Sequence, residues 1–170
     1  VKLTRIYGSW TMDRREFIKA GVAGAVLPAV SVKNSSASTT TAKSFPIFDV
    51  AALDEIPPKT VLYFSYPDAS SPAVLIRLDE AGVNGVGPNN EIVAYSQLCT
   101  HKGCPVAYRS QRKMLICPCH WSTFDPSRAG AMVIGQASHA LPQILLRITE
   151  NIVQAYGVDG LIYGRQTNII

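Results

Sequence analysis

The chemistry-bearing residues of this chain are concentrated in two short stretches, 99–104 and 117–122. They read Cys-Thr-His-Lys-Gly-Cys and Cys-Pro-Cys-His-Trp-Ser, and they hold all four cysteines and two of the three histidines. Thiolates and imidazoles are ligands both of zinc and of iron–sulfur clusters. Each stretch offers one cysteine with a histidine close behind it, and each has one cysteine left over. The two leftover cysteines could pair with each other.

The mixture of thiolates and imidazoles favours an iron–sulfur cluster of raised potential. A 2Fe-2S cluster with four thiolates carries negative charge when it is oxidised, so an added electron meets charge that is already present. Two neutral imidazoles in place of two thiolates remove that charge, and the potential rises from about −400 mV to roughly −150 to +300 mV. We therefore expect an electron carrier that accepts electrons from mild donors. A zinc site or a plain set of disulfides is the alternative.

The two stretches resemble the whole motif of the Rieske 2Fe-2S family, C-T-H-x-G-C followed by C-P-C-H-x-S. This resemblance implies one bound Rieske-type 2Fe-2S cluster. It also implies a role for each of the six residues: Cys99 and Cys117 bind one iron, His101 and His120 bind the other, and Cys104 and Cys119 form a disulfide between the loops.

The resemblance also predicts residues that tune the potential. In the family the serine after C-P-C-H-x donates a hydrogen bond to a bridging sulfide, and Ser122 stands at that place. Two residues later many high-potential members have a tyrosine whose hydroxyl reaches a ligand cysteine, and here that residue is Phe124. Donors directed at sulfur stabilise the reduced cluster. We therefore expect a lower potential than in the tyrosine-bearing members. The stretch 135–142 resembles the family's third loop, which covers the cluster, and its His139 is expected to be a polar loop residue.

Residues 1–44 are predicted to be an export leader and a linker. Residues 13–19 look like a twin-arginine signal, and a largely apolar run follows over 20–32. That run is interrupted by two glycines and a proline and is shorter than the roughly 20 apolar residues that span a bilayer, so it is interpreted as a signal segment. The predicted location is the periplasm, where a disulfide persists. Contact with the membrane is expected only through the leader, if it stays uncleaved.

The net charge of +4 belongs to the leader. Residues 1–40 hold six of the 16 basic residues and two of the 12 acidic ones, so the remaining 130 residues carry ten of each. Nothing in this balance indicates a nucleic-acid partner.

Residues 45–170 are predicted to form one all-β Rieske domain. Short apolar or alternating runs, separated by Pro, Gly and Asn turn signals, predict strands at 45–50, 60–66, 73–79, 91–97, 143–149, 151–156 and 161–163. In this domain only 49–55 looks helical. Such regularly spaced strands are typical of antiparallel sandwiches and barrels. The family resemblance implies an antiparallel β base domain with a cluster-binding subdomain inserted at about 96–142.

Segments outside the motif resemble the small subunit of arsenite oxidase, which is a Rieske protein. They are 85–88, 135–137, 141–147 and 157–166. This resemblance implies a redox subunit of an oxidoreductase with no substrate site of its own. It would relay electrons one at a time from a molybdopterin-containing large subunit to a periplasmic cytochrome c or a small copper protein. The alternative is the Rieske subunit of a quinol-oxidising cytochrome bc-type complex.

Overall fold

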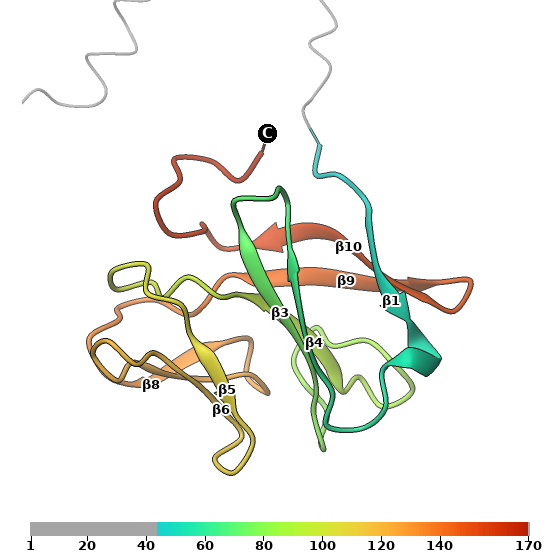
Figure 1. Cartoon of the computed structure of the whole chain (residues 1–170), viewed down its shortest axis with the longest axis horizontal. Helices are drawn as coiled ribbons and strands as arrows, with labels where there is room; N and C mark the ends of the chain where they lie inside the picture. The colour runs from blue at the N-terminus through green and yellow to red at the C-terminus, as the bar shows by residue number, and fades with distance from the viewer. Residues whose placement is uncertain (1–43, 170) are drawn as a thin grey trace, which may run out of the picture. The chain divides into compact units, whose positions relative to one another are not determined.

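The computed structural model describes residues 44–169 (Figure 1). The predicted twin-arginine stretch 13–19, the apolar run 20–32 and the linker before residue 44 lie outside the described residues. In residues 44–169 no helix has the length and the apolar character needed to cross a membrane.

The described residues form two antiparallel sheets, which confirms the all-β prediction. The strands are β1 (Phe48–Ala52), β2 (Val61–Ser65), β3 (Pro72–Arg77), β4 (Ile92–Ser96), β5 (Ala107–Arg109), β6 (Met114–Ile116), β7 (Thr123–Asp125), β8 (Ala131–Ile134), β9 (Gln143–Thr149) and β10 (Ile152–Asp159). One short 3-10 turn, η1 (Leu53–Glu55), follows β1.

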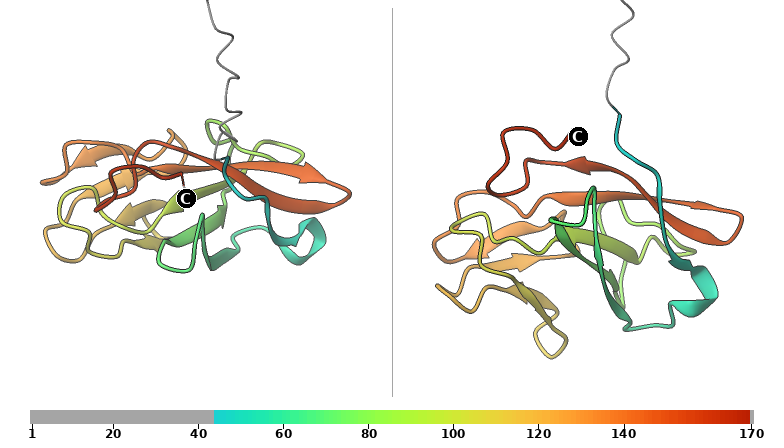
Figure 2. Two further views of the ribbon diagram at one scale, coloured as in Figure 1. Left: turned by 90° about the horizontal axis from the view of Figure 1, so that it is seen from above. Right: turned by 45° about the horizontal axis from the view of Figure 1, so that its top comes forward.

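The two sheets divide the domain into a base and an insertion. The larger sheet has six strands in the order β1-β10-β9-β4-β3-β2, and the smaller has four in the order β5-β6-β7-β8. The smaller sheet lies between β4 and β9 in the chain, within the range 96–142. Figures 1 and 2 show this sheet at one end of the domain and the turn between β9 and β10 at the other.

Strands β3 and β4 of the base are buried on both faces. In β3, Val74 and Ile76 face one apolar core, whereas Ala73 and Leu75 face another. This explains why β3 is an almost continuous apolar run rather than an alternating one. The first of these cores lies between the base and the inserted sheet, and it includes Cys99 and Cys117. Through this core the two candidate ligand loops pack against β3 and β4.

A buried hydrogen bond also joins the two parts. The hydroxyl of Tyr95 in β4 donates to the C=O of Pro126, just after β7, at 2.7 Å. Burial raises the pKa of Tyr95, so the hydroxyl stays protonated and able to donate. This bond connects the base to the inserted sheet.

Two local predictions are wrong. The segment 49–55 is not a helix, because Phe48–Ala52 pairs with β10 and only Leu53–Glu55 forms a 3-10 turn. The stretch 161–163 is not a strand. Its Ile162 N–H donates to the side chain of Asn168 at 3.0 Å, so it belongs to a looped C-terminal segment, 160–169.

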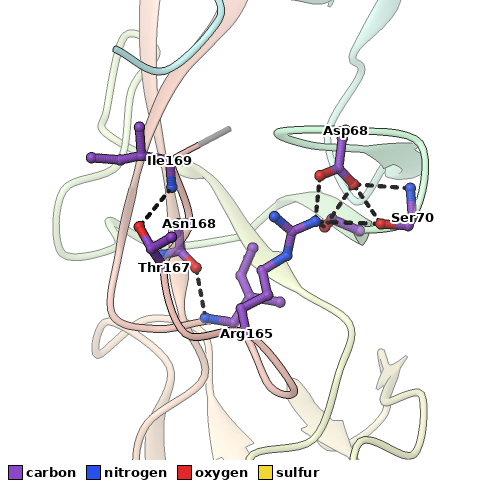
Figure 3. A network of polar contacts seen from close by, with 8 residues as sticks. Asp68, Ser70, Arg165, Thr167, Asn168 and Ile169 are labelled. Carbon is purple, nitrogen blue, oxygen red and sulfur yellow. Dashed lines mark hydrogen bonds and ion pairs between the residues drawn. The ribbon is translucent and has the colours of Figure 1, made fainter. Parts of the chain in front are cut away.

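The C-terminal segment is fastened to the base by an ion pair. Arg165 binds the carboxylate of Asp68 and donates to the hydroxyl of Ser71 at 2.6 Å (Figure 3). Both partners lie in the turn between β2 and β3. The segment therefore returns to the base after β10 instead of extending away from it.

Candidate metal centre

The first candidate loop, 99–104, is closed by two backbone hydrogen bonds. The N–H of Cys99 donates to the C=O of Cys104 at 2.9 Å, and the N–H of Gly103 donates to the C=O of Cys99 at 2.8 Å. Gly103 has a φ of 72°, in the left-handed region that favours glycine. A β-carbon on Gly103 would lie 2.6 Å from the ring of Tyr163. The C-terminal segment therefore packs directly against this loop.

The second candidate loop, 117–122, repeats the backbone pattern of the first. The N–H of Cys117 donates to the C=O of Ser122 at 2.9 Å, and the N–H of Trp121 donates to the C=O of Cys117 at 3.0 Å. Trp121, with a φ of 61°, takes the place that Gly103 has in the first loop. Both loops thus turn their leading cysteine inward, and Cys99 and Cys117 are each only 1% exposed.

The structure brings the two loops side by side. Cys104 and Cys119 form the disulfide that the family resemblance implies, with their Cα atoms 6.5 Å apart. The rings of His101 and His120 meet edge to face, with their centroids 4.7 Å apart. His101 is half-buried, whereas His120 is exposed. The histidine side of the centre therefore faces the surface.

Two buried thiols remain free for a metal. Cys99 and Cys117 are the free cysteines, and burial raises the pKa of the Cys99 thiol, with the neighbouring Cys117 adding to the rise. The Cys117 sulfur also lies within 4.8 Å of the Cys104 and Cys119 sulfurs. Those two sulfurs are in a disulfide and cannot act as thiolates. Cys99 and Cys117 are therefore the candidate thiolate ligands.

One unpaired nitrogen is a candidate metal ligand. Within residues 44–169, Nδ1 of His101 is the single buried side-chain nitrogen or oxygen that has no hydrogen-bond partner. Buried polar atoms almost always have a partner, so an unpaired imidazole nitrogen beside two buried thiols fits a metal ligand. The donor set of two thiols and two imidazoles fits a 2Fe-2S cluster.

The predicted tuning residues lie against this centre. Ser122 is fully buried, and its Oγ accepts hydrogen bonds from the N–H groups of Gln136 and Ala137 at 3.1 and 3.0 Å. Its own hydroxyl hydrogen remains free to donate, and a hydrogen bond from Ser122 is one of the influences that lower the pKa of Cys99. Phe124 is fully buried in the core that contains both free cysteines.

The third loop comes very close to the second. Gly135 has a φ of 120°, and a β-carbon there would lie 2.3 Å from the Cα of Ser122. On its other side this loop is held by Thr100, whose hydroxyl donates to the C=O of His139 at 2.8 Å. The His139 side chain is exposed and bonds only its neighbour Ser138 among the described residues, as expected for a polar loop position.

Comparison with known protein families identifies the kind of domain that contains this centre. The profile of the Rieske 2Fe-2S domain matches residues 47–145, more than half of the chain. The chain belongs to the Rieske family. A Rieske-type 2Fe-2S cluster is therefore its cofactor, as the sequence predicts. That the four converging residues Cys99, His101, Cys117 and His120 are its ligands stays a prediction, which the geometry above supports.

Among curated Rieske proteins, two relatives match nearly the whole chain. The iodate reductase subunit IdrB of Denitromonas iodatirespirans is 35% identical over 162 residues, which cover 92% of this chain and 86% of the relative. The subunit of the same name from Pseudomonas sp. (strain SCT) is 32% identical over 90% of this chain and 82% of the relative. The cytochrome bc1 complex Rieske iron-sulfur subunit of Streptomyces lividans is 46% identical, but over only 39% of this chain and 40% of that protein.

A solved structure with this fold is the soluble domain of the Rieske protein II from Sulfolobus acidocaldarius. It has a TM-score of 0.63 and 24% identity, and the match covers 72% of this chain and 82% of that one. This likeness shows the fold alone.

Sequence reasoning missed one contact of the Rieske centre. Tyr163 packs on the first ligand loop although 60 residues separate it from Gly103. The signal was weak, because the apolar run 161–163 predicts only a strand and nothing in it indicates a contact with a loop 60 residues away. Trp121 takes the equivalent place in the second loop with a similar φ, so the backbone alone does not require glycine at 103, and the Tyr163 ring adds a second restraint there.

Proposed function

We propose that this chain is the electron-transfer subunit of a periplasmic molybdopterin oxidoreductase, exported by the twin-arginine signal at 13–19. The proposal rests on one observation: the iodate reductase subunit IdrB from two organisms matches about nine-tenths of this chain. The resemblance to the small subunit of arsenite oxidase points to the same kind of assembly. In such an assembly the substrate would be converted on another subunit.

The residues of this chain have simple tasks in that role. The bound cluster would take up and release one electron at a time. Burial of Cys99 and Cys117 keeps water from the thiolate side. The exposed His120 leaves the histidine side open to a partner. The disulfide and the third loop fix the distance between the two ligand loops. Electrons would therefore enter and leave on the histidine side.

An unpaired edge supports the presence of a large partner subunit. β8 is an edge strand of the smaller sheet, and its Met132, Val133 and Ile134 are exposed. Exposed apolar edge strands invite association, and monomeric proteins tend to cover or charge them. A large subunit over this edge would explain why no charged residue protects it.

Two reactions are candidates, and they move electrons in opposite directions. The relatives matched over most of the chain favour iodate reduction, in which the cluster supplies electrons to the large subunit. The segments 85–88, 141–147 and 157–166 favour arsenite oxidation, in which the cluster passes electrons to a cytochrome c or a small copper protein. A cytochrome bc-type complex has less support, because the match to its Rieske subunits is confined to 39% of the chain.

The test is a reaction of the purified native assembly, followed by electron paramagnetic resonance of the cluster. We expect the chain to co-purify with a subunit that contains molybdenum. Anaerobic arsenite should then reduce the oxidised cluster if the enzyme is an arsenite oxidase. Iodate should oxidise the reduced cluster if it is an iodate reductase. A chain that co-purifies with a b-type cytochrome, and whose cluster is reduced by a quinol instead, would contradict the proposal.

A further inference from the structure

Charge is divided unevenly between the two parts of the described domain. The cluster-binding part, 96–142, holds five basic residues and one acidic residue. The remaining described residues, 44–95 and 143–169, hold four basic and nine acidic residues. Residues 44–169 carry a net charge of only −1, but they consist of two regions of opposite sign.

Much of the positive charge near the centre has no partner. Lys113 pairs with Asp79 at 3.4 Å, and Arg128 pairs with Asp125 at 3.6 Å. The other three basic residues of the cluster-binding part form no ion pair with an acidic side chain of residues 44–169. They are Lys102, Arg109 and Arg112, and all three are exposed.

Two of these arginines share a groove with an exposed tryptophan. The groove has a volume of about 320 Å³ and is lined by Arg109, Gln111, Arg112, Ile116, Pro118 and Trp121. Trp121 is 69% exposed and follows His120 directly. Pro118 belongs to the same ligand loop. The groove thus lies against the loop that carries the outer histidine.

Negative charge gathers at the far end of the domain. The N–H of Leu53 donates to the C=O of Asn151 at 2.8 Å, so η1 lies beside the turn between β9 and β10. This region holds four acidic side chains, Asp49, Asp54, Glu55 and Glu150. Figures 1 and 2 place it opposite the smaller sheet. The acidic residues Asp79 and Glu80 lie near Tyr108 of the β5–β6 hairpin, and Asp79 forms an ion pair with Lys113.

We propose that the groove between Arg109, Arg112 and Trp121 is the docking site of a soluble electron carrier with an acidic surface around its redox group. Arginine binds carboxylates through two parallel hydrogen bonds, and tryptophan and arginine are enriched among the residues that dominate binding at protein interfaces. The acidic far end repels the same carrier, so the electrostatic field of the domain would steer the carrier towards the ligand loop. The inference rests on the proposed electron-transfer function and adds the chemistry of the partner.

The test measures electron transfer from the reduced full-length holoprotein to two proteins of opposite charge. The acidic probe is plastocyanin, a copper protein, and the basic probe is mitochondrial cytochrome c. Stopped-flow mixing at an ionic strength of about 0.01 M and about 0.15 M spans weak and strong screening. We expect plastocyanin to react faster than cytochrome c at low salt. Its rate should fall about 10-fold or more at the higher salt.

Single charge reversals separate the groove from the overall charge. Arg109→Glu and Arg112→Glu should each lower the plastocyanin rate at low salt about 5-fold or more. The matched control is Arg147→Glu, an exposed reversal on β9, which should leave the rate within about 2-fold. Both groove arginines are exposed and in or beside a turn, so the variants are expected to fold, which the unchanged resonance spectrum of the cluster would verify.

Different results would contradict the docking site and the electron-transfer function. If the groove variants react like the Arg147 variant, or if cytochrome c is the faster probe for the natural chain, the docking site is wrong although electron transfer stands. If the cluster cannot be reduced and reoxidised at an electrode, the electron-transfer function itself is wrong and the docking site goes with it.

Discussion

By the family resemblance, Phe124 is expected to give this centre a lower potential than members with a tyrosine at this position have. It is fully buried and packs in the core that holds Cys99 and Cys117. We expect Phe124→Tyr to raise the reduction potential by about 40 mV, because one hydrogen bond to a cluster sulfur is worth about 1 kcal/mol. Protein-film voltammetry would measure the shift.

The control for this substitution adds the same hydroxyl elsewhere. Phe48 on β1 is exposed and lies outside that core, so the cluster of the Phe48→Tyr variant should have the same potential as that of the natural chain. Ser122→Ala is a less clean test, since it also removes the acceptor of two backbone N–H groups. A Phe124→Tyr variant with an intact resonance spectrum and an unshifted or lowered potential would refute the role given to this position.

At the scale of elements, the third loop depends on its approach to the second. A β-carbon at Gly135 would meet the Cα of Ser122 at 2.3 Å, whereas one at Gly164 would meet nothing within 4 Å. Both glycines have positive φ. Gly164→Ala should therefore cost only backbone strain, about 1–2 kcal/mol. Gly135→Ala should cost about 3 kcal/mol or more, because the loop must also move.

Urea unfolding would give both costs, and visible absorption would report retention of the cluster. We expect the Gly135 variant to lose its cluster more readily and the Gly164 variant to keep it. Equal losses in the two variants would show that the third loop does not restrain the centre.

The elements also show where sequence reasoning succeeds and where it stops. The longer strands β2, β3, β4 and β9 were predictable, since their apolar runs end at clear turn signals. The error at 49–55 arose because pairing with β10 overrides local preference, as tertiary context commonly does. The short strands β5, β7 and β8 have only three or four residues each and therefore too little pattern to detect.

The candidate centre was more predictable than the fold around it. A ligand motif has fixed local spacing, so the sequence alone brings out Cys99, His101, Cys117 and His120. The contact of Tyr163 with the first loop has no such spacing, because it depends on how the segment after β10 folds back. Pairwise contacts across such a distance follow from the assembled fold rather than from a local pattern.

At the scale of the whole molecule, the C-terminal segment connects the base to the centre. Arg165 and the turn at Asp68 fasten it to the base (Figure 3), and Tyr163 covers Gly103 of the first ligand loop. The carboxylate of Asp68 also accepts hydrogen bonds from the N–H and the hydroxyl of Ser70 at 3.0 and 2.7 Å. The folded state therefore favours the ionised form of this carboxyl group.

This network makes part of the stability depend on pH at the acid end. The Arg165 side chain, helped by Ser70, lowers the pKa of Asp68 from 3.8 to about 2. A carboxyl group whose pKa is lower in the folded state stabilises that state at any pH above its unfolded pKa. The contribution is lost as the pH falls from about 4 to about 2.

Asp68→Asn should therefore lower the free energy of unfolding by up to about 1 kcal/mol at neutral pH. This loss should stay the same down to about pH 5 and vanish near pH 2. Urea unfolding at a series of pH values would measure it, with the exposed Glu80→Gln as control. A cost that stays constant down to pH 2 would mean that Asp68 acts through its shape rather than its charge.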